Sequence, residues 1–142
     1  MTKPESADYL NRARRTLQQA RAMAAIELPD VAGRTAYLAA YHAAQAFIFD
    51  RTGKVTKSHG GARSEFARLA KEDPRIDRAF TAFLAQAYAL KEIADYGVGP
   101  DAGVTVVEAK QAIETAERFV DCISGLISSQ RPTPSRDNGA KS

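Results

Sequence analysis

The sequence predicts an all-α domain, an antiparallel bundle of four long helices and one short helix. Alanine, leucine, glutamine and arginine, which have high helix propensity, dominate long stretches of the 142-residue chain. Apolar residues recur in these stretches at spacings of three and four, as on one face of a helix. No segment alternates apolar and polar residues between turn signals, so we expect no strands.

The first two long helices are bounded by clear local signals. The first is predicted over residues 5–25, with a buried stripe at helical spacing: Leu10, Ala13, Leu17, Ala20 and Ala24. Pro29 begins the second, because proline has no amide hydrogen to leave unbonded and its φ already suits a first turn. The second helix is expected to continue to Arg51, and Gly53 ends it.

Two further helices follow a glycine-containing connection. A short amphipathic helix is predicted over 62–70, with Phe66 and Leu69 directed inward. Asp73 and Pro74 then match an N-cap followed by a proline at the first helical position. The next long helix is therefore expected to start there and to run to about Tyr96.

The last helix follows a break rich in glycine and proline. Thr105 and Glu108 form a capping-box pattern, in which each side chain satisfies a backbone amide of the opening turn. The helix they begin continues through Ile127. We expect residues 1–5 to be a flexible N-terminus, 6–129 to form the bundle, and 130–142 to be a disordered polar tail.

Composition limits the classes of function. The net charge of +3 is too small to indicate a nucleic-acid-binding protein by itself. No apolar run reaches about 18 residues and the first residues are polar, so we expect a soluble cytoplasmic protein that does not contact membranes. One cysteine, Cys122, excludes an intramolecular disulfide framework. Two histidines, His42 and His59, without ligand spacing, lead us to expect no metal and no cofactor.

The second long helix carries the first candidate site. Arg34, Tyr37 and Tyr41 follow one another at helical spacing and so lie on or beside one face. They indicate either a polar cleft or a core face whose arginine is paired and whose tyrosine hydroxyls stay at the rim. Lys91 and Asp95 share a face of a helix that ends near the start of this one, which predicts an Arg34–Asp95 ion pair.

The connection before the short helix carries the second candidate site. It is strongly basic, with Glu65 as the acidic residue among five basic ones: Arg51, Lys54, Lys57, Arg63 and Arg68. Lys57 and His59 stand at the start of a helix, where free backbone amides can bind a phosphate. A solvated basic loop is the alternative interpretation.

Four motifs together resemble the HEPN domain superfamily, in particular its small stand-alone group. They are Arg34-x-x-Tyr37-x-x-x-Tyr41-x-Ala43-Ala44, Lys57-Ser58-His59-Gly60-Gly61 with Phe66, Leu90-Lys91-Glu92-Ile93-Ala94-Asp95-Tyr96, and Ala112 to Val120. The resemblance covers about residues 6–127. It implies a bundle of four long helices and one short one, a homodimer, and pairing with a nucleotidyltransferase as toxin and antitoxin. RNA or nucleotides are the ligands it implies.

The resemblance also suggests where chemistry would occur. HEPN ribonucleases resemble one another in an arginine and a histidine with four to six residues between them, and they use no metal. Here Lys91 stands in place of that arginine and Tyr96 in place of the histidine. Lysine keeps the charge without the bidentate fork, and tyrosine is a weak proton acceptor at neutral pH.

Three functions remain open on these residues. The first is a nucleotide-binding or RNA-binding module of a two-component system, with Arg34, Tyr37, Tyr41, Asp95, Lys57 and His59 as ligand-binding residues. The second is a metal-independent ribonuclease with Lys91 and Tyr96 as catalytic residues. The third is a structural dimerisation subunit. Modification of Tyr96 by the partner nucleotidyltransferase is a further alternative.

A homodimer is also expected from the aromatic residues. The bundle has more aromatic side chains than four apolar stripes require, notably Phe47, Phe49, Phe83 and Tyr88. Surplus apolar surface of this kind is usually covered by a partner.

Overall fold

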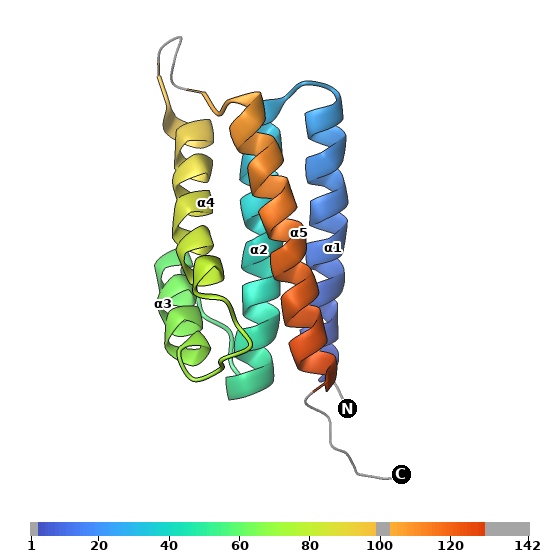
Figure 1. Ribbon diagram of the computed structural model, residues 1–142, viewed down its shortest axis with the longest axis vertical. Helices are drawn as coiled ribbons and strands as arrows, with labels where there is room; N and C mark the ends of the chain where they lie inside the picture. Colours follow the sequence, from blue (N-terminus) through green and yellow to red (C-terminus); the bar gives the residue numbers. More distant parts are fainter. Residues whose placement is uncertain (1–2, 99–102, 130–142) are drawn as a thin grey trace.

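The computed structural model describes residues 3–98 and 103–129. These residues form five α-helices and confirm the predicted all-α bundle: α1 (Pro4–Ala25), α2 (Pro29–Thr52), α3 (His59–Ala70), α4 (Arg78–Tyr96) and α5 (Val106–Ser129). The four long helices run side by side in alternating directions, and the short α3 lies at the end of the bundle where α2 ends and α4 begins (Figure 1).

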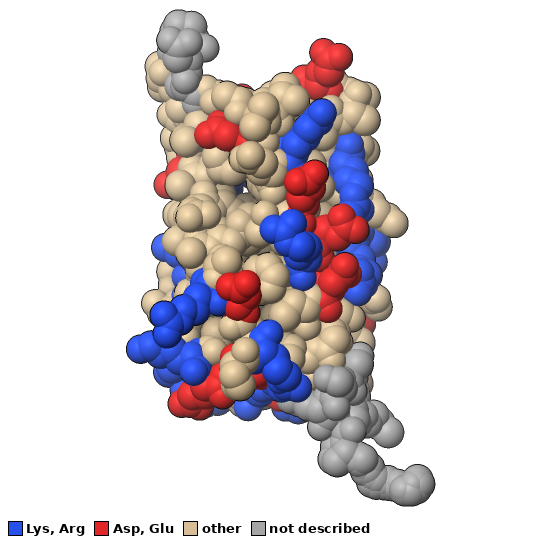
Figure 2. Space-filling model, viewed as in Figure 1, with Lys and Arg blue, Asp and Glu red and all other residues tan. Residues whose placement is uncertain are grey.

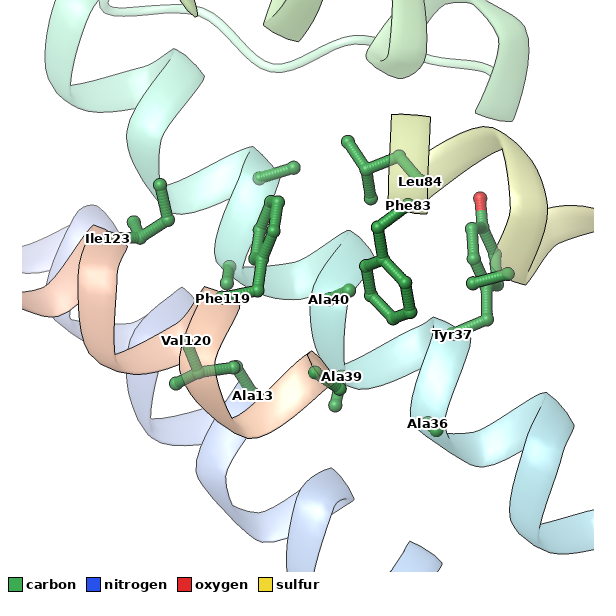
Figure 3. Packing of buried hydrophobic residues seen from close by; sticks show 14 of the residues in the cluster. Ala13, Ala36, Tyr37, Ala39, Ala40, Phe83, Leu84, Phe119, Val120 and Ile123 are labelled. Carbon is green, nitrogen blue, oxygen red and sulfur yellow. The ribbon is translucent and has the colours of Figure 1, made fainter. Parts of the chain in front are cut away.

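Helix α2 is the centre of the bundle, because it packs against each of the other four helices. Half of its buried residues are alanine, which lets neighbouring helices approach closely on several sides. The alanines exposed by 1% or less are Ala32, Ala36, Ala39, Ala40, Ala43, Ala44 and Ala46. Large side chains from the surrounding helices fill the space beside them, as Phe83 and Phe119 do beside Ala39 and Ala40 (Figure 3).

The large core residues meet around Phe119 of α5. Its ring centroid lies 5.2 Å from that of Phe66 and 5.4 Å from that of Phe80, so α3 and α4 are joined to α5 through aromatic contacts. Phe47 and Phe83 are 0% and 6% exposed, so their assignment to surplus surface for a partner is wrong. Phe47 of α2 packs against Phe66 of α3, and Phe83 of α4 packs against Phe119 of α5, so both rings belong to the core.

Most helix ends follow the predicted capping signals. Gly53 ends α2 with φ +75°, in the left-handed region that favours glycine, and its N–H bonds to Phe49 O. The Thr105 and Glu108 side chains each accept a bond from the other's backbone N–H, which confirms the capping box. Helix α3 begins earlier than predicted, at His59, because the Ser58 side chain accepts a bond from Gly61 N–H.

The predicted start of the fourth helix at Asp73 and Pro74 is wrong. Asp77 is the N-cap of α4, and its carboxylate accepts a bond from Ala79 N–H at 2.9 Å. The Asp73 carboxylate instead accepts bonds from Arg75 and from Arg51 at the end of α2. It anchors the α3–α4 connection to α2. It also accepts a bond from Arg75 N–H, as a cap would, but the turn that it begins ends before Asp77 and is not continued into α4.

Two further expectations concern membrane contact and the ends of the chain. No helix among residues 3–98 and 103–129 is long and apolar enough to cross a membrane. The predicted tail over 130–142, and the first two residues, lie outside the described residues.

The alanine face of α2 leads to a stability prediction. Ala40→Leu adds three carbon atoms where α2 is completely buried, so we expect it to lower the free energy of unfolding by about 1–3 kcal/mol. Ala85→Leu, on the exposed side of α4, is the matched control and should change it by less than about 0.5 kcal/mol. Urea denaturation followed by circular dichroism measures both, and equal effects of the two variants would contradict the close packing of α2.

Candidate functional site

An acidic residue at the end of α4 holds two cations. Asp95 Oδ2 lies 2.8 Å from Lys91 Nζ, and Asp95 Oδ1 lies 3.5 Å from Arg34 Nε. The predicted Arg34–Asp95 ion pair is therefore confirmed. It forms because antiparallel packing brings the start of α2 beside the end of α4. Only 17% of the Lys91 side chain is exposed, and its hydrogen bond to Asp95 raises its pKa, so it stays protonated.

A histidine and three tyrosines lie beside this ion-pair cluster. His59, the first residue of α3, has its Nδ1 atom 2.7 Å from the Tyr37 hydroxyl. Its ring centroid is 4.6 Å from that of Tyr41 and 5.6 Å from that of Tyr88. Tyr37 is completely buried, so its hydroxyl lies inside the cluster and not at the rim.

The charged and aromatic parts are one site. Lys91 Nζ lies 5.8 Å from the centre of the Tyr88 ring, and its charge adds to burial in lowering the pKa of His59. Helices α2, α3 and α4 thus bring most of the predicted residues together. We call this set the α2–α3–α4 site: Arg34, Tyr37, Tyr41, His59, Arg63, Tyr88, Lys91 and Asp95.

Two residues predicted for the site are less closely connected to it. Tyr96 is the last residue of α4 and is 70% exposed, with Lys91 Nζ at 5.9 Å from its ring centre. Lys57 is exposed on the segment before α3. No hydrogen bond or ion pair within the described part of the chain links Lys57 to His59.

Sequence reasoning did not assign Arg63 and Tyr88 to the site. The Arg63 guanidinium carbon lies 4.3 Å from the centre of the Tyr88 ring, which is a cation–π contact. Arg63 follows His59 by four residues, so the two share a face of α3, and this spacing was the available signal. Tyr88 stands three residues before Lys91 and shares its face of α4 in the same way.

Gln45, also not predicted, fixes the segment that leads into α3. Its Nε2 donates to the Tyr41 hydroxyl at 2.9 Å and to Thr56 O at 3.0 Å. Its Oε1 accepts from the Thr56 backbone N–H. The side chain is 3% exposed, so these bonds satisfy a buried amide. They hold the connection from α2 to α3 in place and with it the position of His59.

Burial and neighbouring charges set the protonation of the site. Burial, followed by the charges of Lys91 and Arg63, lowers the pKa of His59, so its imidazole is neutral at neutral pH. Burial raises the pKa of Tyr37, so that hydroxyl keeps its proton. No cluster of three or more metal-ligating side chains occurs among the described residues.

A separate groove lies between α4 and α5. It has a volume of about 650 Å³ and is lined on α4 by Phe83, Leu90 and Ile93 and on α5 by Ala112 and Arg118. Much of the surface over α4 on this face is uncharged, whereas charges gather over α1 and α5 and at the α3 end (Figure 2). The groove and the α2–α3–α4 site have no residue in common.

A bundle of four long helices, with a short helix beside a site of cations and tyrosines, places the protein in a class of small α-helical domains. A family model described as HEPN domain matches residues 6–126, so the chain belongs to the HEPN domain family. The chain is 30% identical over 117 residues to the UPF0332 protein glr0978 of Gloeobacter violaceus, a match that covers 82% of this chain and 91% of that protein.

A solved structure shares the fold. The crystal structure of TT1696 from Thermus thermophilus matches with a TM-score of 0.73. The match covers 87% of this chain and 98% of that chain at 21% sequence identity. At this identity the likeness concerns the arrangement of helices.

His42 lies on α2, and its surroundings disfavour the protonated imidazole. Burial, followed by the charge of Arg12, lowers its pKa from 6.5 to about 4. Its Nδ1 atom is buried without a hydrogen-bond partner in the described part of the chain. The folded protein therefore holds His42 neutral at pH values where the unfolded chain protonates it.

We expect this histidine to make the fold sensitive to acid. A folded-state pKa below the unfolded one gives stability that is present above pH 6.5 and is lost as pH falls toward 4. Between pH 7 and 4.5 the loss due to His42 should be about 2 kcal/mol. Urea denaturation of wild type and His42→Leu at both pH values tests this. Parallel losses in the two proteins would contradict it.

Proposed function

We propose that this HEPN domain binds nucleotides or RNA through their phosphates at the α2–α3–α4 site. The observation that carries the proposal is the meeting of three cations, Arg34, Arg63 and Lys91, with the partly exposed rings of Tyr41 and Tyr88. Cations attract phosphates, and aromatic rings provide surfaces on which bases stack. The site combines both in one place.

We further propose that the domain acts in the cytoplasm as a homodimer within a two-component system, paired with a nucleotidyltransferase as toxin and antitoxin. Membership of the HEPN family supports this setting. Exposed apolar side chains at the end of α4 and the start of α5 support a subunit contact there. They are Ile93, Tyr96, Val98, Val106 and Val107, exposed by 40% to 90%.

A metal-independent ribonuclease is the second candidate function. Lys91 stays protonated beside Asp95 and can stabilise negative charge that develops on a phosphate. Tyr96 lies next to it at the end of α4. The two candidates differ in one observable result, which is whether bound RNA is cut.

We expect the protein to bind labelled single-stranded RNA in EDTA without cutting it. Affinity should fall steeply with salt, because binding releases counterions from the phosphates. Lys91→Ala removes a charged contact and should weaken binding about tenfold. Fluorescence anisotropy at several salt concentrations measures affinity, and gel electrophoresis of the same samples detects cleavage.

Arg21→Ala is the control for the loss of one positive charge. Arg21 pairs with Glu117 on the α1 side of the bundle, away from α4, and its loss should leave affinity nearly unchanged. Cleavage that Lys91→Ala and Tyr96→Phe abolish would favour the ribonuclease. If RNA and nucleotides do not bind, and Arg34→Ala only lowers stability, the domain is a structural dimerisation subunit.

The subunit contact has its own test. Light scattering at micromolar concentration should give twice the 15.4 kDa mass of the chain. Val107→Glu places a charge among the exposed apolar residues and should yield a monomer. Val55→Glu is the matched control on the α2–α3 connection, at the other end of the bundle, and should remain dimeric. A monomeric wild type would contradict the dimer.

A further inference from the structure

Arg63 stands out in the site because its charge has no acidic partner. Among the described residues its buried Nη1 atom has no hydrogen-bond partner, and no carboxylate lies within ion-pair distance of it. Lys91, in contrast, is held between Asp95 at 2.8 Å and Glu92 at 3.8 Å. A buried donor without an acceptor destabilises the free protein, and an anion that accepts its hydrogen bond removes that penalty.

The hydrogen bond between Tyr37 and His59 has a preferred direction. Tyr37 is buried and keeps its proton, and the positive charge of Arg63 acts on its hydroxyl. A hydroxyl beside a cation turns its lone pairs toward the cation and its O–H away from it. Tyr37 therefore donates to His59 Nδ1 at 2.7 Å. In a neutral imidazole the proton then resides on Nε2, which becomes a donor.

The two hydrogen-bond donors, Arg63 and His59, lie close together. They lie four residues apart on one face of α3, and both pack against the ring of Tyr88, Arg63 with its guanidinium and His59 with its ring. The charged groups around His59 are Arg63 from α3 and Lys91 and Glu92 from α4, and α2 contributes the phenols of Tyr37 and Tyr41. Donors and positive charge predominate at this place.

We propose that Arg63 Nη1 and His59 Nε2–H form an oxyanion site that binds a phosphate oxygen of the ligand. The inference rests on the proposed function and deepens it, because it names the group of the ligand that is held and the atoms that hold it. His59 acts in this site as a hydrogen-bond donor and not as a proton acceptor. The site is distinct from the Arg34–Lys91–Asp95 cluster, whose cations already share a carboxylate.

Thermal unfolding with inorganic pyrophosphate as the probe tests the oxyanion site. At about ten times its dissociation constant, pyrophosphate should raise the Tm of the wild type by about 3–6 °C over sodium chloride of equal ionic strength. Arg63→Met should lose this rise. Arg68→Met is the matched control, because Arg68 lies exposed on the same helix and is bonded to Glu65, and it should keep the rise.

Each result of this experiment bears on the oxyanion site. No rise in the wild type, a rise that survives in Arg63→Met, or a rise lost equally in Arg68→Met would overturn it. Circular dichroism establishes that Arg63→Met is folded before the comparison is made. If Arg63→Met does not fold, the tautomer of His59 in the wild type tests the oxyanion site instead.

Nitrogen-15 NMR of the His59 ring reads that tautomer directly. The wild type should show the proton on Nε2, and pyrophosphate should shift the Nε2 signal most. Tyr37→Phe removes the donor to Nδ1 and should increase the fraction with the proton on Nδ1. Tyr41→Phe is the control, because its hydroxyl bonds to Gln45 while its ring also packs on His59. A wild type with the proton on Nδ1 would overturn the proposal.

The failure of this inference and the failure of the proposed function give different results. If Arg63→Met binds RNA and nucleotides as tightly as the wild type, the oxyanion site is wrong and the proposed function stands. If pyrophosphate raises the Tm through Arg63 while RNA and nucleotides do not bind, the oxyanion site stands and the proposed function is wrong.

Discussion

The close packing of the other helices around the alanine face of α2 is the constraint on which the structure depends. Because half of the buried residues of α2 are alanines, four helices pack against it at once. Its other residues therefore have fixed neighbours. Arg34, Tyr37, Tyr41 and Gln45 follow one another along α2 at spacings of three and four. Arg34 contacts Asp95 of α4, and Tyr37 and Tyr41 contact His59 of α3. Gln45 contacts the connection between α2 and α3.

The site has two parts that differ in electrostatic balance. In one part Asp95 compensates two cations, so the ion pairs hold the end of α4 against the start of α2 without a ligand. In the other part the Arg63 guanidinium lies against the Tyr88 ring, and its buried Nη1 has no acceptor among the described residues. The first part is complete in the free protein, whereas the second is satisfied only when an acceptor is present.

Local signals explain what the sequence could predict. Pro29, Gly53 and the Thr105–Glu108 box act within one turn, so the helix ends they mark were predicted. Asp73 and Pro74 do begin a turn, in which Asp73 accepts from Arg75 N–H, but nothing local shows that this turn stops before Asp77 or that Asp73 also bonds to the distant Arg51. In the site, Arg34 and Asp95 followed from antiparallel topology alone. The Tyr37–His59 bond did not, since it depends on the path of the connection that Gln45 holds.

Because Phe47 and Phe83 are buried, the surface expected to contact a second subunit must lie elsewhere on the bundle. Both rings are buried inside the bundle and are not available to a second subunit. The exposed apolar residues lie instead where α4 ends and α5 begins, and Asp30 at the start of α2 holds this end together by accepting a bond from Val104 N–H. Arg34 and Asp95 lie at the same end. A subunit placed there would contact the ion-pair cluster directly, so occupation of the site and assembly of the dimer would depend on the same few side chains.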